Sequence, residues 1–199
     1  MKIAIIGATG TLGRAVADAL GHHEIIRVGR SRGDLQVDIT NESSVDALFA
    51  STGRLDAIIA TTGNLFFGPL QSMTAADFNV SLQDKLLGQV RLALKGQHIL
   101  SDGGSITLTS GIIADEPIAQ GASASAVNAA LAGFVRAAAC ELPRGIRINL
   151  VSPTMLAESA AAYGAFFPGF ESVPASRAAL AFRRSVEGIQ SGQVFKVGY

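Results

Sequence analysis

A glycine-rich turn close to the N-terminus places the strongest constraint on how this chain folds. Residues Lys2–Ile6 form an apolar run of strand length, and the sequence G-A-T-G-T-L-G follows directly, from Gly7 to Gly13. An amphipathic stretch, Leu12–Leu20, opens inside this turn and has helical spacing. A strand, a glycine turn and a helix in this order are typical of the first unit of a dinucleotide-binding fold.

The glycines of this turn suit the binding of a pyrophosphate. Gly7 permits the tight turn, Gly10 lets the backbone approach the phosphates, and Gly13 allows the helix to pack closely on the strand. Free N–H groups and the helix dipole then stabilise the negative charge, and two threonine hydroxyls can add donors. An ordinary glycine-rich turn is the alternative interpretation. The predicted cofactor contacts here are Gly7, Thr9, Gly10, Thr11, Leu12 and Gly13.

The rest of the chain alternates strand-like and helical segments. The strand-like runs are rich in Ile, Val and Leu, as expected for parallel strands buried on both faces. Right-handed crossovers limit the topology to a doubly wound sheet. We therefore predict one α/β domain over residues 1–199, a Rossmann-type parallel sheet of about seven strands with helices on both faces. The predicted strands are Lys2–Ile6, Glu24–Val28, Leu35–Asp38, Leu55–Ala60, Ser105–Leu108, Arg147–Leu150 and Gln193–Val197, and the predicted helices are Leu12–Leu20, Ser43–Phe49, Ala75–Leu94, Ser123–Glu141 and Ser176–Val186.

Composition excludes several classes of function. The chain is 48% hydrophobic and 16% charged, so it can bury enough apolar surface to fold. Its net charge is zero, which gives no basic excess for binding a nucleic acid. No run approaches the ~18 apolar residues of a membrane span. Cys140 is the only cysteine, and His22, His23 and His98 lie at predicted element ends. We expect a cytoplasmic protein with no metal, nucleic-acid or membrane partner.

The end of the second predicted strand indicates which dinucleotide binds. A carboxylate at this point would bind the 2′-hydroxyl of NAD, but the chain reads I-I-R-V-G-R-S-R. Arg30 can hold a 2′-phosphate with its fork of donors, and Ser31 can add a hydroxyl. We therefore predict NADP(H) as cofactor, with NAD less favoured. A solvated surface arginine is the alternative.

Several motifs in the second half of the chain occur in a fixed order. T-L-T-S-G ends at Gly111, N-A-A-L-A-G-F begins at Asn128, and I-R-I-N-L-V-S-P-T ends at Thr154. This order resembles the short-chain dehydrogenase/reductase family. The resemblance implies that Ser110 donates a hydrogen bond to a substrate carbonyl, whose oxygen gains charge on hydride addition. It also implies cofactor contacts at Asp38, Ile39, Thr61, Thr62, Gly63, Pro153 and Thr154.

The same resemblance reveals a departure at the expected catalytic centre. The family carries Y-x-x-x-K on the helix after the serine, with the tyrosine as proton donor. Counting back from N-A-A-L-A-G-F places Ala124 at the tyrosine position and Asn128 at the lysine position. The family's N-L-x-G on the preceding helix is K-L-L-G here, with Lys85 at the asparagine position. The amine and the amide are therefore exchanged between two helices.

Two functional hypotheses follow from this exchange. In the first, the chain is an NADP(H)-dependent oxidoreductase that reduces a small carbonyl compound or enone with Ser110, Lys85 and Asn128. A desolvated lysine would have its pKa lowered into a useful range for proton transfer. In the second, the chain is a non-catalytic NADP(H)-binding sensor or regulator, and Lys85 is a surface residue. A sugar-nucleotide epimerase shares the glycine spacing, but it normally needs the tyrosine–lysine pair and a larger C-terminal domain.

The segment Met155–Val173 is rich in glycine and aromatic residues and follows the sixth predicted strand. We predict that this segment forms a lid over a substrate pocket, and a packed surface loop is the alternative. Tyr163 lies inside it, and packing with the neighbouring phenylalanines is its expected role. The resemblance also implies association through Ala75–Leu94 and Ser123–Glu141, so we expect a homodimer or homotetramer.

Overall fold

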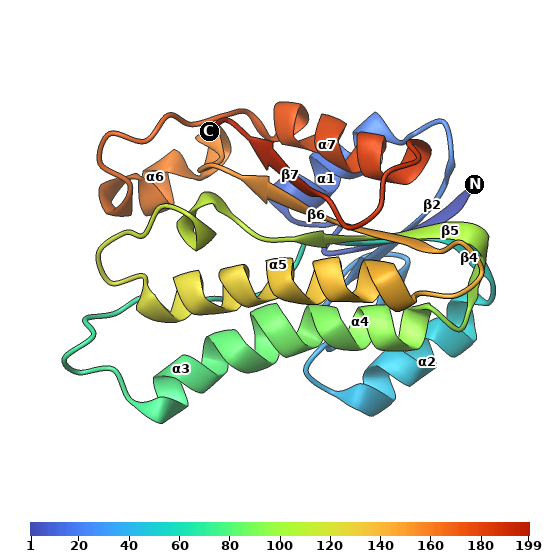
Figure 1. Cartoon of the computed structure of the whole chain (residues 1–199), viewed down its shortest axis with the longest axis horizontal. Coiled ribbons are helices and arrows are strands. Elements are labelled where there is room, and N and C mark those ends of the chain that lie inside the picture. Colours follow the sequence, from blue (N-terminus) through green and yellow to red (C-terminus); the bar gives the residue numbers. More distant parts are fainter.

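A seven-stranded, fully parallel sheet forms the centre of the structure, in the strand order β3-β2-β1-β4-β5-β6-β7 (Figure 1). The computed structural model describes all residues from 1 to 199. The strand order reverses between β1 and β4, as in a doubly wound Rossmann-type sheet, so the predicted fold class is confirmed. The strands are β1 (Lys2–Ile6), β2 (Glu24–Gly29), β3 (Leu35–Gln36), β4 (Leu55–Ala60), β5 (Leu100–Thr109), β6 (Arg147–Pro153) and β7 (Val194–Val197).

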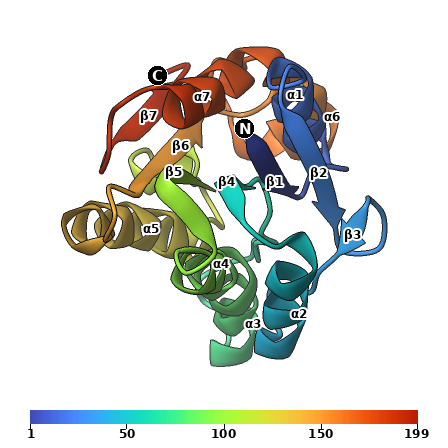
Figure 2. The same ribbon diagram turned by 90° about the vertical axis from the view of Figure 1, so that its right-hand side faces the viewer.

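Helices cover both faces of the sheet, as Figure 2 shows along the strands. The first and last long helices pack on one face, and the helices from the middle of the chain pack on the other. The bounds are α1 (Thr11–Ala19), α2 (Glu42–Thr52), α3 (Ala75–Ser81), a π-helical turn (Leu82–Gly88), α4 (Gln89–Gly96), α5 (Ala122–Glu141), α6 (Ala160–Tyr163) and α7 (Ala175–Glu187), with single 3-10 turns at Ile112–Ala114, Ala157–Ser159 and Gly164–Phe166.

The alternation of side chains along β1 divides the core into two layers. Ile3 and Ile5 point to the layer covered by α1 and α7, while Ala4 and Ile6 point to the layer covered by α2, α4 and α5. All four side chains are buried, which explains why the strand reads as a continuous apolar run. Phe182 on α7 is the largest fully buried side chain of the first layer.

Three strands differ from the predicted bounds by two residues or more: β3 is shorter, β5 is longer at both ends, and β6 continues from Leu150 to Pro153. β3 ends at Gln36 rather than Asp38, because the backbone N–H of Asp38 bonds to the hydroxyl of Ser44 in α2 instead of to a neighbouring strand. β5 begins at Leu100, before a pair of glycines that interrupts the apolar pattern. The register between β4 and β5 shifts at the same place, which accommodates the extra residues.

Helix α5 is long and apolar enough to cross a membrane by length and composition alone, which corrects the expectation that no segment approaches that limit. In the structure, Leu131 and Val135 of this helix belong to the core layer that covers the sheet. Alanines on its outer side raise the mean hydropathy of the whole helix. A core helix of a globular protein passes the same test, so the finding is weak evidence for a membrane span.

Removing the Phe182 ring should strongly destabilise the fold. Phe182→Ala is expected to lower the free energy of unfolding by about 3–5 kcal/mol, because it leaves a cavity between α7 and the sheet. Urea denaturation followed by circular dichroism measures this loss. Leu180→Ala on the same helix is the matched control, because that side chain is 60% exposed and its loss should change stability by less than about 0.5 kcal/mol. Equal losses for the two variants would contradict the assigned core.

Candidate active site

Two adjoining cavities lie at the carboxyl ends of the strands, where parallel α/β sheets bind their ligands. The first cavity, of about 250 Å³, lies over the glycine turn and the ends of β1, β2 and β4. The second, of about 280 Å³, lies between the ends of β5 and β6 and the segment after β6. Asn64 lines both cavities and therefore marks the boundary between them.

The glycine turn forms one wall of the first cavity through Gly7, Thr9 and Gly10. Gly7 has a φ of +90°, and a Cβ there would lie 2.7 Å from the carbonyl oxygen of Thr61, so only glycine fits. Gly10 is the N-cap of α1 and has no side-chain capping bond, which leaves the first amides of the helix free for an anion. Thr11, Leu12 and Gly13 form the first turn of α1 and do not line the cavity.

A basic and an acidic side chain stand at the outer end of the first cavity. The Arg30 guanidinium lies 3.8 Å from a carboxylate oxygen of Asp38, and both residues line the cavity. Two hydrogen bonds from Thr40 and the charge of Arg30 hold the pKa of Asp38 below its usual range. The Arg30 side chain is 69% exposed, so it is free to turn toward a ligand. Ser31 is exposed and does not line the cavity.

The remaining predicted cofactor residues divide between the two cavities. Ile39, Thr61 and Thr62 line the first cavity. Gly63 lines the second, as do Pro153 and Thr154 at the end of β6. The Thr154 hydroxyl donates to the backbone carbonyl of Glu171, so its hydrogen is already engaged.

The three predicted catalytic residues come together in the second cavity, although they derive from three different elements. Ser110 follows β5, Lys85 lies in the π-helical turn, and Asn128 lies on α5. All three are at most 6% exposed. The Ser110 hydroxyl donates to the backbone carbonyl of Asn128 at 3.0 Å, which ties the end of β5 to α5.

Asn128 leaves a buried acceptor without a partner. Its side-chain N–H donates to the backbone carbonyl of Ala124 at 2.7 Å, which fixes the orientation of the amide. The side-chain oxygen of Asn128 is buried and has no hydrogen-bond partner within the protein. An unsatisfied buried acceptor costs about 1–3 kcal/mol, so a ligand that donates a hydrogen bond here would relieve that cost. Ala124 is itself fully buried and has no polar side-chain atom.

The helical segment that carries Lys85 runs without a gap from Ala75 to Gly96, as the predicted helix Ala75–Leu94 implies, but its central part is not α-helical. A π-helical turn, Leu82–Gly88, separates α3 from α4 and contains Lys85. Buried Gln89 fixes this turn to β5. Its amide donates to the carbonyls of Lys85 (3.0 Å) and Thr109 (2.9 Å), and it accepts from the Thr109 N–H at 2.8 Å. π-Turns often occur at functional sites.

Gln89 was not predicted as part of the site. The only sequence signal is a glutamine among the inward-facing residues of an amphipathic helix, four positions after Lys85. The close approach of Gly63 to Lys85 was not predicted either. A Cβ at Gly63 would lie 2.8 Å from the Cα of Lys85. The absence of a side chain at Gly63 therefore lets the lysine lie close to the end of β4.

Burial lowers the pKa of Lys85 from 10.5 to about 8. Desolvation is the dominant cause, and the negative charge of the neighbouring Asp84 opposes it only in part. The amine therefore gains and loses a proton close to neutral pH, as required of a general acid or base. Lys85 is also the only charged residue that lines the second cavity.

The segment predicted as a lid forms the outer wall of the second cavity, where Met155, Leu156, Tyr163 and Phe167 line it. Both ends of the segment are anchored, because Leu156 and Val173 form a β-bridge. Tyr163 packs against Phe67, with 6.4 Å between the ring centres. The ring therefore packs as an aromatic side chain, but its partner is Phe67 outside the lid rather than one of the neighbouring phenylalanines of the lid.

The second tyrosine of the chain lies outside this cavity. The Tyr199 hydroxyl is paired with Ser152 at 2.6 Å and with Asp115 at 3.1 Å. Burial is the first cause that raises the pKa of Tyr199 to about 12. A phenol with a raised pKa, held by two partners, is poorly suited to replace the tyrosine missing at position 124.

A model of a known protein family, described as enoyl-(acyl carrier protein) reductase, matches residues 8–194 of this chain. The hydroxynaphthalene reductase arp2 of Aspergillus fumigatus is 28% identical over 155 residues, which are 71% of this chain and 57% of that protein. The cyclopentanol dehydrogenase of Comamonas testosteroni is 29% identical over 155 residues, which are 70% and 60% of the two chains. This chain thus spans less than two thirds of the length of these curated relatives.

Solved structures resemble the chain over nearly its whole length. The protein lin1944 from Listeria innocua is 47% identical, with a TM-score of 0.97 over 99% of both chains. A small-chain dehydrogenase in complex with NADPH is 27% identical, with a TM-score of 0.87 over 99% of this chain and 96% of that one. The arrangement of strands and helices is therefore shared with both proteins.

The buried amine should make stability depend on pH in a defined window. The unfolded chain keeps the Lys85 proton up to about pH 10.4, whereas the folded chain loses it near pH 8. Below both values the fold buries a charge, so Lys85→Met is expected to be more stable than the parent by up to about 3 kcal/mol at pH 7. Between pH 8 and about 10.4 the unfolded state binds more protons, so the parent gains stability and the difference shrinks.

Urea denaturation of both proteins at several pH values measures this difference. Lys95→Met is the control, because Lys95 is solvent-accessible and paired with Glu42 and Asp46, which raise its pKa. Its effect on stability should not vary over the same window. A constant difference between Lys85→Met and the parent would contradict the lowered pKa.

Proposed function

This chain belongs to the short-chain dehydrogenase/reductase family, and we propose that it transfers hydride between NADP(H) and a small carbonyl compound or enone. The convergence of Ser110, Lys85 and Asn128 on one cavity beside a dinucleotide-type cleft carries the proposal. Two of these groups are a titrating amine and an unpaired buried acceptor. Perturbed and unsatisfied groups that gather in one cavity are typical of an active site.

The residues of the first cavity fit NADP(H). The uncapped N-terminus of α1 and the close backbone at Gly10 suit a pyrophosphate. The exposed guanidinium of Arg30 suits a 2′-phosphate. The unpaired side-chain oxygen of Asn128 suits a ribose hydroxyl on the side of the second cavity. The NADPH bound to the related small-chain dehydrogenase supports this choice of cofactor. When bound, the cofactor supplies or accepts the hydride.

Lys85 and Ser110 act on the oxygen of the substrate. As hydride reaches the carbon, negative charge develops on the carbonyl oxygen, and the Lys85 ammonium stabilises it. The proton then moves from the lysine Nζ to that oxygen, and solvent restores it. Ser110 orients the oxygen by turning its hydroxyl from the Asn128 carbonyl to the substrate. Ala124 leaves no phenol for this step, so the lysine takes the place of the family's tyrosine.

The second cavity favours a small, largely apolar substrate. Eight of its 17 lining residues are hydrophobic, and it encloses about 280 Å³. No carboxylate lines it, so a positively charged substrate would find no partner, whereas a neutral or anionic one would meet Lys85. Ile112, Ile113 and Phe167 supply much of the apolar wall.

A non-catalytic NADP(H)-binding sensor is the second candidate function. Two observations favour it: Ala124 offers no proton, and the Ser110 hydroxyl is already bonded to the Asn128 carbonyl. In that case the second cavity would respond to ligands without turnover. The homo-oligomeric state and the cytoplasmic location expected from the sequence stay predictions.

Turnover should depend on the lysine and the serine. NADPH oxidation, followed by absorbance over a panel of ketones, enones and quinones, is expected for the parent protein. Ser110→Ala should lower kcat by about 10²-fold, and Lys85→Ala by about 10²-fold to 10⁴-fold, with the Kd for NADPH nearly unchanged. Tyr163→Phe tests the competing phenol and should retain most of the activity. Lys95→Ala, at a half-buried surface lysine that lines neither cavity, is the control.

Each alternative outcome has a clear meaning. Full activity of Lys85→Ala would exclude the lysine as proton donor. A large loss in Tyr163→Phe would assign that role to the phenol. Tight NADPH binding without turnover of any compound in the panel would favour the sensor over the oxidoreductase.

Preference for the phosphorylated cofactor should depend on Arg30. Arg30→Ala is expected to raise the Kd for NADPH by at least about tenfold, because the 2′-phosphate loses charge-assisted hydrogen bonds. The Kd for NADH should change little, and fluorescence titration measures both values. Arg32→Ala is the matched control, since Arg32 is an exposed arginine that does not line the cavity. Equal losses for NADPH and NADH would contradict the assigned contact.

A further inference from the structure

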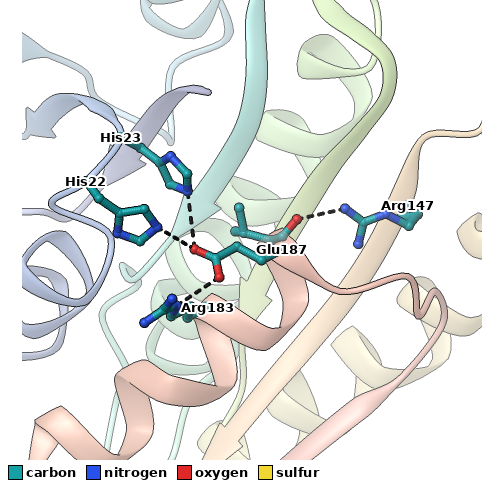
Figure 3. A network of polar contacts seen from close by, with 6 residues as sticks. His22, His23, Arg147, Arg183 and Glu187 are labelled. Carbon is teal, nitrogen blue, oxygen red and sulfur yellow. Dashed lines mark hydrogen bonds and ion pairs between the residues drawn. The ribbon is translucent and has the colours of Figure 1, made fainter.

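A second group of chemically active side chains lies at the opposite end of the sheet from both cavities. His22 and His23 occupy the turn between α1 and β2, and Glu187 is the last residue of α7. Figure 3 shows both imidazole rings directed at the carboxylate of Glu187. None of the three residues lines either cavity, so the proposed function makes no use of them.

The three groups lie close enough together to share one metal ion. The Nε2 atom of His22 lies 2.8 Å from Oε1 of Glu187, and the Nε2 atom of His23 lies 3.2 Å from the same oxygen. All the possible ligand atoms lie within 4.8 Å of one another. Ligand atoms around tetrahedral Zn²⁺ stand about 3.3 Å apart, so only small side-chain shifts would be needed.

The surrounding structure holds the three groups in place. Arg183 binds Oε2 of Glu187 at 2.8 Å and leaves Oε1 to the histidines. Arg147 donates to the backbone carbonyls of Ser185 and Val186, which fixes the chain just before Glu187. Figure 3 shows Arg147 beside this end of α7. Buried contacts between α1 and α7 keep the two ends of the site together. Hydrogen bonds to the ligand residues, such as these, orient metal ligands in proteins.

We propose that His22, His23 and Glu187 bind Zn²⁺ or a similar divalent cation that favours imidazole ligands, and so link α1 to α7. Water completes the tetrahedral shell, because the His22 side chain is 49% exposed. Each neutral imidazole binds through Nε2 and carries its proton on Nδ1. Two nitrogens and one carboxylate oxygen suit Zn²⁺, Cu²⁺ or Ni²⁺ better than Mg²⁺ or Ca²⁺, which prefer oxygen ligands. The nearby Arg183 charge moderates the affinity, which we expect in the micromolar range.

Calorimetric titration of the full chain with ZnCl₂ tests this site. We expect one equivalent to bind, and His23→Asn and Glu187→Gln each to weaken binding at least tenfold. His98→Asn and Cys140→Ser are matched controls, because they remove the other histidine and the only cysteine and should leave binding unchanged. MgCl₂ should give no comparable signal. Unchanged binding in His23→Asn, or no binding at about 10⁻⁵ M by the parent, would overturn the proposal.

Thermal unfolding supplies an independent measurement. A ligand that binds only the folded state raises Tm, so ZnCl₂ should raise the Tm of the parent and of His98→Asn. Each variant is compared with itself with and without the metal, because His23→Asn also loses a hydrogen bond to Glu187. An equal rise in Tm for His23→Asn would show that the ion acts elsewhere.

Discussion

The geometry of the candidate active site depends on one buried side chain, the amide of Gln89. The π-helical turn interrupts the regular α-helical hydrogen bonds. Gln89 follows this turn, and its side-chain amide donates to the backbone carbonyl of Lys85 within it. The same amide exchanges two hydrogen bonds with the backbone of Thr109 at the end of β5. The positions of Lys85 and Ser110 are thus linked through a single rigid group rather than through a loop. Such preorganisation suits electrostatic catalysis, because the backbone segments that carry both groups are already in place when charge develops.

The second cavity contains polar groups that the folded protein leaves unsatisfied. The Lys85 amine is buried with only a neighbouring carboxylate to offset its desolvation, and the side-chain oxygen of Asn128 has no donor. Buried polar groups without partners lower stability, and natural proteins tolerate them mainly where a ligand completes the set. The rest of the sheet is filled by aliphatic side chains that meet the ordinary rules of packing. The aliphatic core therefore stabilises the fold, whereas the unsatisfied polar groups of the second cavity are suited to bind a ligand.

The fold could be predicted because strand and helix periods are local properties of the sequence. The glycine turn before α1 and the alternation of short apolar runs with amphipathic segments predict a doubly wound sheet without knowledge of any distant contact. The π-helical turn could not be predicted, since it depends on the contact between Gln89 and Thr109, twenty positions later. The cluster of His22, His23 and Glu187 could not be predicted for the same reason, because Glu187 lies 165 positions after His22. The resemblance to a family identified Lys85 and Asn128 as candidates. Their burial and hydrogen bonding depend on tertiary structure and could not be predicted from the sequence.

The boundary between the two cavities has a consequence for how their ligands communicate. Asn64 lines both cavities and donates to the carboxylate of Asp84 at 2.6 Å. Asp84 lines the first cavity, and its charge raises the proton affinity of Lys85 in the second. A ligand that neutralises or screens Asp84 therefore makes the lysine a stronger acid. Thermodynamic linkage requires the reverse as well, so the protonation state of Lys85 sets how tightly such a ligand is held. Through this one carboxylate, ligand binding in the first cavity and the protonation of Lys85 in the second are coupled.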